Sequence, residues 1–328
     1  MVSREKSPDA AVYLVGGLGN QLFQLAAALT LAEGRQITLI NQEDLARPNS
    51  MGLPAICDYQ LPPHVKVENG TGSGWKGHVS RRSLNYALRR SIYPMPGIDS
   101  GFMRSAVDLL IEFSCEMSLG NPRSLISTRT AGFDPAAVST PSSFLMVGYF
   151  QSWRYTSNST VASVLRGMKL RVTPNWLQEI RKQAFTEKPI IVQIRRGDYS
   201  KAANLGLLPN QYFQHGIRKL REVLPENPLW IFSDDPAQAL KVLPETELTR
   251  KPRVVPEVGT QASAVETLEA MKLGAGYVIS NSTFGWWGAW GADLPASRVV
   301  VPEPWFADRS VVPDLIPNGW NSIPRDGR

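Results

Sequence analysis

Residues 11–40, AVYLVGGLGNQLFQLAAALTLAEGRQITLI, carry the pattern that decides the fold class. A short apolar run, Val12–Val15, leads through a glycine-rich loop into a helical pattern from Leu22 to Glu33. Gly34 ends this predicted helix, and Ile37–Ile40 has the composition of the next strand. A strand, a helix and a second strand in this order predict a parallel α/β sheet.

The second half of the chain repeats this alternation more clearly. The predicted strands are Ile190–Ile194, Leu229–Phe232, Arg253–Val255, Tyr277–Ser280 and Val299–Val301. The predicted helices are Gln211–Val223, Ala237–Val242, Ala264–Leu273 and Phe284–Gly291. Short apolar strands between helices are typical of a doubly wound sheet, which binds ligands at the carboxyl ends of its strands. We therefore predict an α/β fold with two Rossmann-like domains, residues 1–180 and 181–328, that face a central cleft.

The composition excludes several classes of protein. Of the 328 residues, 43% are hydrophobic, which is too many for a disordered chain, and two cysteines cannot support a disulfide scaffold of this length. No run of about 18 apolar residues predicts a membrane span, and Met1–Asp9 lacks the apolar core of a signal peptide. We therefore expect a soluble, cytoplasmic protein. The net charge of +6 favours an anionic partner: nucleic acid, a membrane surface or a phosphorylated ligand.

Part of the positive charge lies in the segment Ser80–Tyr93, which includes Arg81, Arg82, Arg89 and Arg90. The pattern predicts a basic, weakly amphipathic helix, whose charged face is either solvated or a peripheral contact with the inner face of a membrane. Elsewhere, arginines are paired inside α/β turns and no basic stripe runs along the chain, so we expect no nucleic-acid partner. The preceding stretch, Pro48–Gly77, is rich in Pro, Gly and Ser, and we predict it to be irregular.

The glycine loop resembles a dinucleotide site only in part. Gly17 and Gly19 lie between a strand and a helix, but Leu22 stands where the third glycine is required. The second strand ends in Asn41 instead of an acid that would hold a ribose, which disfavours a dehydrogenase. The loop either forms a tight structural turn or presents the amides around Gly17, Gly19 and Asn20 to an anion or a sugar hydroxyl.

Two adjacent arginines, Arg195 and Arg196, follow the strand Ile190–Ile194 and precede a Gly-Asp turn. Guanidinium groups lose hydration at such a strand end, so an anion or a carboxylate has to meet them. A diphosphate is a natural partner because the planar guanidinium binds its oxygens with two parallel bonds. We expect one arginine to pair internally with Asp198 or Asp234 and the other to bind ligand.

Paired carboxylates, Asp234 and Asp235, follow the next predicted strand. Such a pair can hold a metal ion, act as a base or orient the arginines. The chain has no D-x-D pattern, and its three histidines, His64, His78 and His215, are scattered. We therefore expect chemistry that needs no metal ion.

A polar turn, Asn281–Thr283, lies between a strand and a helix and supplies an N-cap. The free amides of that helix and the hydroxyls of the turn are suited to a phosphate. Trp286 and Trp287 are expected to pack in the core. Glu266 and Glu269 share a helix face, where one of them either accepts hydrogen bonds from a guanine or is simply solvated.

These segments and several others occur in the order found in one known family. The shared blocks are GGLGNQLFQ (Gly16–Gln24), GYFQSWRY (Gly148–Tyr155), IRRGDY (Ile194–Tyr199), FSDD (Phe232–Asp235), SNSTFGWWGAW (Ser280–Trp290), VPEPWF (Val301–Phe306) and LIPNGW (Leu315–Trp320). Together they resemble the family 11 glycosyltransferases, the α-1,2-fucosyltransferases that use GDP-L-fucose.

The resemblance implies a GT-B-like fold with an N-terminal acceptor domain and a C-terminal donor domain. It implies inverting transfer of L-fucose from GDP-L-fucose to the 2-hydroxyl of a terminal β-galactoside, without a metal ion or other cofactor. The implied catalytic residues are Arg195, Arg196, Asp198 and Asp234. The implied nucleotide-sugar contacts are Gln193, Arg195, Asp235, Glu266, Asn281, Ser282, Thr283, Gly17, Gly19 and Asn20. The implied acceptor contacts are Gln21, Tyr149, Gln151 and Trp153.

Two positions depart from the family pattern. The histidine usual before the double arginine is Gln193 here, and an acid usual near the guanine is replaced by Thr267, which leaves Glu266 or Glu269 to substitute. Both departures concern the donor base. A related transferase with another sugar or another acceptor hydroxyl, or a non-catalytic glycan-binding protein of the same fold, therefore remains an alternative.

Overall fold

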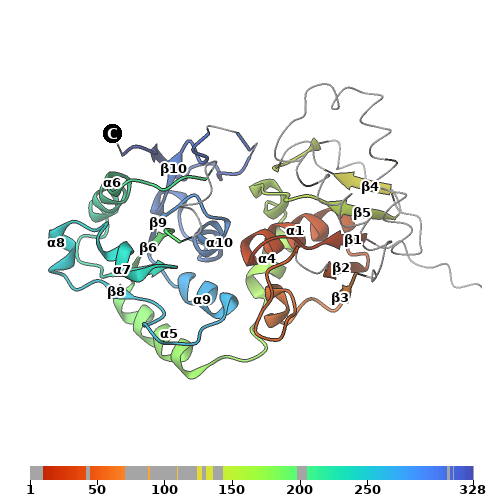
Figure 1. The fold of residues 1–328 in the computed structure, drawn as a ribbon, viewed down its shortest axis with the longest axis horizontal. Helices are drawn as coiled ribbons and strands as arrows, with labels where there is room; N and C mark the ends of the chain where they lie inside the picture. The colour runs from red at the N-terminus through yellow and green to blue at the C-terminus, as the bar shows by residue number, and fades with distance from the viewer. Residues whose placement is uncertain are drawn as a thin grey trace, which may run out of the picture. The chain divides into compact units, whose positions relative to one another are not determined.

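The computed structural model describes residues 10–41, 45–70, 88, 109, 124–127, 131–135, 143–197, 205–308, 311–312 and 314–327. The chain divides into two compact units, each with its own sheet (Figure 1). The first unit is Met1–Lys169 with Val312–Leu315, and the second is Leu170–Val311 with Ile316–Arg328. The predicted boundary at residue 180 falls inside helix α5 (Asn175–Glu187), which packs against α9 (Ala264–Met271) of the second unit. The division therefore precedes this helix.

The described part of the first unit is built on a parallel sheet with strand order β3-β2-β1-β5-β4. Its strands are β1 (Ala10–Tyr13), β2 (Ile37–Asn41), β3 (Val65–Asn69), β4 (Ser124–Ser127) and β5 (Phe144–Val147). Helix α1 (Leu18–Ala32) connects β1 to β2 and is almost wholly buried, which explains its leucine- and alanine-rich sequence. It contacts α4 (Ser159–Gly167) and the short 3-10 helices η1 (Ala55–Asp58) and η3 (Trp153–Thr156).

The prediction of an irregular Pro48–Gly77 is wrong at Val65–Asn69, which forms the edge strand β3. Only Val65 of this strand is buried, so β3 has no continuous apolar run, and its pairing with β2 fixes it instead. The predicted basic helix Ser80–Tyr93, with its arginines from Arg81 to Arg90, lies outside the described residues except for Leu88. Leu88 is buried against Tyr13 and Val147 of this unit.

The described part of the second unit is built on a parallel sheet with strand order β11-β10-β9-β6-β7-β8. Its strands are β6 (Ile190–Ile194), β7 (Leu229–Ser233), β8 (Arg253–Val254), β9 (Gly276–Ile279), β10 (Val299–Glu303) and β11 (Asn321–Pro324). Its remaining helices are α6 (Asn210–Arg221), α7 (Pro236–Leu240), α8 (Glu245–Leu248), α10 (Thr283–Gly291) and the 3-10 helix η5 (Ala296–Arg298). The strands and helices predicted for this half are confirmed, with small shifts of their ends.

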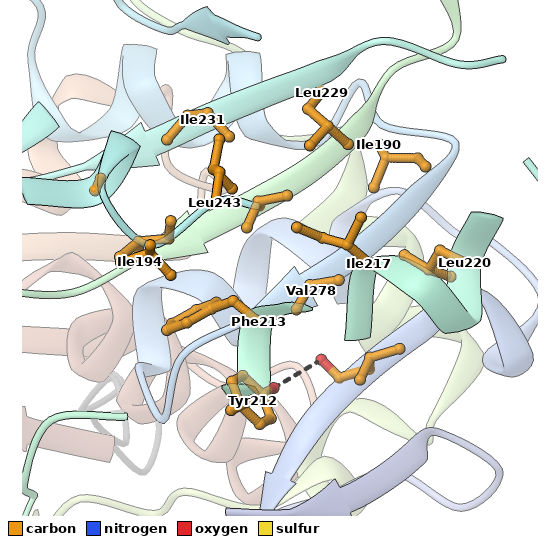
Figure 2. Close-up of a cluster of buried hydrophobic side chains, with 14 of the residues drawn as sticks. Ile190, Ile194, Tyr212, Phe213, Ile217, Leu220, Leu229, Ile231, Leu243 and Val278 are labelled. Carbon is orange, nitrogen blue, oxygen red and sulfur yellow. Dashed lines mark hydrogen bonds between the residues drawn. The ribbon is translucent and has the colours of Figure 1, made fainter. Parts of the chain in front are cut away.

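Helix α6 packs on one face of the second sheet through a buried apolar cluster (Figure 2). A Cβ at Gly216 would lie 2.7 Å from a methyl group of Val278, so this glycine permits the close approach of helix and sheet. The hydroxyl of Tyr212 donates to the carbonyl of Ile279 at 2.7 Å, at the carboxyl end of β9. Burial raises the pKa of Tyr212, which keeps the hydroxyl protonated as a donor.

Helices α9 and α10 contact each other, and α10 contacts β9. Trp286 and Trp287 of α10 are buried and lie edge to face with ring centroids 5.0 Å apart, so their predicted packing role is confirmed. The predicted α/β class is also confirmed, because each of the two units is built on a parallel sheet, as in a Rossmann-like domain. No helix among the described residues has the length and apolar character needed to span a membrane.

Candidate functional site

Three of the polar segments singled out from the sequence meet at the carboxyl edge of the second sheet. Strand β6 lies between β9 and β7, and all three are parallel. Their ends therefore lie side by side, and the chain continues from them into Arg195–Gly197, Asp234–Asp235 and Ser280–Thr283. Ligands of doubly wound sheets bind at this edge. The structure therefore brings these three segments together at one edge.

The side chain of Asp234 holds the double-arginine turn. Its Oδ1 accepts from the backbone N–H of Arg196 at 2.9 Å, and its Oδ2 accepts from the backbone N–H of Gly197 at 3.0 Å. The Nε of Arg195 lies 3.1 Å from Oδ2 in an ion pair. The register Ile194↔Ser233 explains this contact, because it sets the next residues of the two strands opposite each other. The expected pairing of one arginine with an acid is thus found for Arg195 and Asp234.

Arg196 is turned toward the protein. Its guanidinium donates to the carbonyl of Leu208 at 2.9 Å and to Oδ1 of Asn210 at 3.3 Å, and it lies 5.7 Å from the ring centroid of Phe213. Burial lowers the pKa of Arg196, and the charge of Asp234 partly opposes that shift. The guanidinium therefore connects the turn to the start of α6. A pocket of about 340 Å³ adjoins it, lined by Arg196, Leu207, Asn210, Asp235, Gln238, Lys241 and Val242.

Ser280 connects the double-arginine turn to the turn before α10. Its hydroxyl accepts from the backbone N–H of Arg195 at 3.0 Å and donates to the carbonyl of Gln193 at 3.0 Å. The side-chain oxygen of Gln193 accepts from the backbone N–H of Ser280 at 3.1 Å. Gln193 is only 4% exposed, and a Cβ at Gly285 would lie 2.7 Å from the same oxygen. The side chain of Gln193 therefore packs against the start of α10 and helps to fix its position.

Ser282 occupies the N-cap position of helix α10, but its side chain makes no capping hydrogen bond. Its backbone angles are extended. Ser282 is buried and Thr283 is half-buried. The first amides of a helix carry a partial positive charge and suit an anion. Ser282, Thr283 and the start of α10 thus offer hydroxyls and amides at the edge where Arg195 lies.

Asp235 and Glu266 are both engaged in helix capping. Asp235 is the N-cap of α7 and accepts from the backbone N–H of Gln238 at 3.1 Å. Glu266 forms a capping box with Ser263 at the start of α9, and its Oε2 also lies 3.3 Å from the indole nitrogen of Trp176. Both caps were visible in the sequence: Asp235 precedes Pro236, and Ser263 precedes Glu266 by three residues. Neither structural role excludes a contact with ligand through the remaining carboxylate oxygen.

Arg325 belongs to the site's framework and was missed in the sequence analysis. Its guanidinium donates to the carbonyl of Trp305 at 2.8 Å and to that of Gly206 at 2.8 Å, and it also contacts the carbonyl of Leu205. The side-chain amide of Asn281 donates to the same Leu205 carbonyl at 2.9 Å. Asn281 is buried, and together with Arg325 it holds the segment that returns to α6. No local pattern could have revealed a contact between residues 120 positions apart.

The first unit carries a second polar group of residues, at the carboxyl ends of β1 and β5. Gln21 is fully buried: its amide nitrogen donates to the carbonyl of Gly16 at 2.9 Å, and its oxygen accepts from Ile56 N–H at 2.9 Å. Asn20 is half-buried, and its Oδ1 accepts from the side-chain amide of Gln151 at 3.0 Å. The sequence blocks GGLGNQLFQ and GYFQSWRY thus meet in space. Gln21 orders the loop from within, whereas Asn20 reaches the surface.

Gly16 has a left-handed φ of +73°, and a Cβ there would lie 2.5 Å from the side chain of Asn20. This glycine therefore fits the tight turn that was one of the two alternatives for the loop. Gly17 has an extended conformation and directly precedes α1, which includes Gly19. The loop is thus a structural turn whose following amides lie at a helix start.

The other predicted acceptor residues lie on the same block. Tyr149 is half-buried against the cluster around Tyr13 and Val147. Trp153 is half-buried, and its backbone N–H donates to the carbonyl of Asp314 at 2.9 Å. Asp198 lies outside the described residues. Within the described part of the chain, no three His, Cys, Asp or Glu side chains gather so that they could hold a metal ion.

Comparison with known proteins adds a family and relatives. The family model described as Glycosyl transferase family 11 matches residues 131–310. O-antigen biosynthesis glycosyltransferase WbnK from Escherichia coli is 26% identical over 310 residues, which cover 90% of this chain and 94% of that protein. Alpha-1,2-colitosyltransferase from Escherichia coli is 25% identical over 166 residues, or 49% of this chain and 55% of that protein. The crystal structure of fucosyltransferase NodZ from Bradyrhizobium has a TM-score of 0.46 at 17% identity, covering 86% of this chain and 93% of that one.

Proposed function

The chain belongs to glycosyl transferase family 11, and from that premise we propose that it transfers L-fucose from GDP-L-fucose to the 2-hydroxyl of a terminal β-galactoside. In this proposal the transfer inverts the anomeric carbon and needs no metal ion. The observation that carries it is the carboxyl edge of the second sheet, where Ser280 joins the Arg195 turn to the start of α10. A cation and a helix N-terminus at one edge suit a diphosphate.

The proposed chemistry follows from where charge develops. When the glycosidic bond to the donor breaks, negative charge builds on the departing diphosphate. The side chain of Arg195 and the first amides of α10, with the hydroxyls of Ser282 and Thr283, stabilise that charge more than they stabilise the intact donor. Arg196 acts indirectly, because its guanidinium is bound to the carbonyl of Leu208. Asp198 is retained as a candidate base for the acceptor hydroxyl.

The remaining donor contacts are assigned by position. Helix α9 precedes β9, so it begins at the carboxyl edge, and Glu266 lies in its first turn. Glu266 is therefore the proposed contact for guanine, through the carboxylate oxygen that the capping box leaves over. Gln193 is buried, and Asn281 and Asp235 have the structural contacts described above. In this proposal these three residues hold the loops of the donor site in place through those structural contacts.

The first unit supplies the acceptor contacts in this proposal. Asn20 and Gln151 form a hydrogen-bonded pair of amides, and Tyr149 and Trp153 are partly exposed aromatic residues of the same block. Amides and aromatic rings are common partners of sugar hydroxyls and sugar faces. Gln21 is fully buried and orders the loop through its hydrogen bonds with Gly16 and Ile56. Gly17 and Gly19 contribute helix-start amides to the acceptor in this proposal, although the resemblance implied a donor contact.

A transfer assay tests the proposal directly. Wild-type protein incubated with GDP-L-fucose, EDTA and a β-galactoside should release GDP and form an α-1,2-linked product. Arg195→Ala should lower kcat/KM by about 10²-fold or more, because it removes a cation from the developing diphosphate charge. Absence of turnover across lactose and type 1-like acceptors, with GDP-L-fucose intact, would contradict the proposal.

A second candidate is transfer of another sugar, which the similarity to an alpha-1,2-colitosyltransferase favours. The match covers about half of each chain. Of the two departures from the family pattern, Thr267 is next to Glu266, the proposed guanine contact, whereas Gln193 contacts Ser280 before α10. Thermal shifts with GDP, UDP and dTDP separate the donor bases. Stabilisation by UDP or dTDP but not by GDP would show that the donor is not GDP-L-fucose. Glycan binding without transfer from any donor would indicate a non-catalytic glycan-binding protein.

A further inference from the structure

The carboxylate of Asp234 faces three N–H donors of one short turn. Its two oxygens accept from the backbone of Arg196 and Gly197 and pair with Nε of Arg195, all within 2.9–3.1 Å. Consecutive backbone N–H groups in a turn commonly form a site for an external anion. Here an internal carboxylate already fills that position. The side chain of Arg195, and not the amides of the turn, is therefore the group that the turn can offer to a ligand's phosphates.

The arrangement also restricts how Arg195 can point. The ion pair is made through Nε, one of the three nitrogens of the guanidinium group, so it fixes the orientation of that group. The hydroxyl of Ser280 fixes the backbone N–H of Arg195. The side chains of Arg195 and Asp234 are 23% and 21% exposed, so the pair is largely shielded from water. Shielding strengthens a charge pair relative to one in bulk solvent.

We infer that Asp234 is the residue that positions Arg195 for the donor diphosphate, and that it is not the general base. This inference rests on the proposed function and deepens it. A base must reach the acceptor hydroxyl, whereas both oxygens of Asp234 are engaged with the turn. Asp234 acts through Arg195, so its loss weakens interactions with the phosphates and leaves those with the nucleoside unchanged.

The test compares binding of GDP with binding of guanosine by calorimetry. Asp234→Asn should weaken GDP binding by about 10-fold and lower kcat/KM by about 10²-fold, as expected for a displaced catalytic group. The affinity for guanosine should stay within about twofold of the wild-type value, because guanosine has no phosphates that could contact Arg195. A general loss of structure would weaken both ligands, and a base that touches only the acceptor would weaken neither.

A double-mutant cycle identifies the residue through which Asp234 acts. In an Arg195→Ala background, adding Asp234→Asn should cost less than about threefold in GDP affinity, because the partner is already absent. Independent, multiplying effects would overturn the inference. Glu247→Gln is the matched control: it breaks the bidentate pair of Glu247 with Arg221, at 2.6 and 2.9 Å, in the same unit but outside the proposed site. It should lower thermal stability and leave GDP affinity unchanged.

The result separates the inference from the proposed function. If wild type binds UDP or dTDP in place of GDP, the proposed donor is wrong, and the cycle is run with that diphosphate and its nucleoside. The same selective loss then supports the role of Asp234. Binding of no nucleoside diphosphate would overturn both.

Discussion

The substitution Gly197→Ala, which adds one methyl group, tests the contact between Asp234 and the double-arginine turn. A Cβ there would lie 2.8 Å from Oδ2 of Asp234, which is closer than real Cβ contacts. Gly197→Ala should therefore push the carboxylate away from the turn and lower kcat/KM by roughly 10-fold, since small displacements of catalytic groups are costly. Steady-state kinetics with GDP-L-fucose measure the effect.

The matched control for this substitution is Gly167→Ala, at the end of α4. A Cβ at Gly167 would meet nothing within 4 Å, so this variant should keep wild-type kinetics. Circular dichroism should show the same folded signal for both variants. Wild-type kcat/KM in Gly197→Ala would mean that the contact between Asp234 and the turn does not matter for activity.

Two adjacent acids show what can be read from single residues. Asp235 precedes a proline and caps α7, a role that the Asp-Pro pattern alone predicts. Asp234 contacts a turn 37 and 38 residues earlier in the chain, and only the register of β6 with β7 brings them together. The sequence could therefore indicate that one acid orients the arginines, but not which one. Local capping is encoded locally, whereas the contacts of Asp234 with the double-arginine turn depend on strand pairing.

Two serines stand at the N-cap of the two helices that border the site, and they differ in what they do. Ser263 accepts from the backbone of Glu266 and completes a capping box, whereas the side chain of Ser282 makes no capping bond. Ser263→Ala should cost about 1 kcal/mol of folding free energy. Ser282→Ala should cost less folding free energy than Ser263→Ala, because no capping bond is lost. It should nevertheless weaken GDP binding, because in our proposal its hydroxyl binds phosphate.

Chemical denaturation and GDP titration of the two serine variants measure these opposite effects. For a unit of this size, a loss of about 1 kcal/mol corresponds to a fall in Tm of roughly 2–4 °C. A large loss of stability in Ser282→Ala together with unchanged GDP affinity would show that its hydroxyl is structural. The first turn of α10 would then have to bind phosphate through its amides alone, or not at all.

At the scale of elements, the central strands were predictable, whereas two of the edge strands, β3 and β11, were not. β6 and β9 are wholly buried, so their apolar runs stand out in the sequence. β3 and β11 each have a single buried residue, Val65 and Ile323, and take their conformation from one neighbouring strand. Edge strands of this kind have no periodicity of their own, because only one face or one residue enters the core.

At the scale of the molecule, the polar segments divide between two separate sheets. The strand-helix alternation was enough to predict both Rossmann-like units and to place the arginine, aspartate and serine segments at strand ends. It could not predict the long-range supports, such as the contact of Arg325 with the carbonyl of Gly206, because these pair side chains with backbone far along the chain. Because the proposal assigns the donor to the second unit, it predicts which unit GDP should stabilise.

GDP should protect the second unit and leave the first unit unchanged in hydrogen exchange. At a GDP concentration of 100 times Kd, binding stabilises the unit that holds it by about 2.7 kcal/mol, which slows exchange through unfolding of that unit by roughly 100-fold. The effect should include the amides of residues 195–197 and of the first turn of α10, Thr283–Gly285. Each unit has its own sheet, so amides of α1 after Gly17 and Gly19 should keep their rates.

Protection of the first unit instead of the second would contradict the proposal. This outcome is physically possible because the glycine loop also offers helix-start amides. Protection of Gly17–Asn20 without protection of Thr283–Gly285 would place the nucleotide on the first unit and reverse the proposed roles of the two units. Protection in both places would assign the loop to the donor as well, as the resemblance implied for Gly17, Gly19 and Asn20. Guanosine at the same multiple of its Kd serves as the control, because it stabilises the same unit to the same extent. Equal slowing at Glu266 with the two ligands, but greater slowing at Arg195 with GDP, would separate the guanine contact from the diphosphate contact.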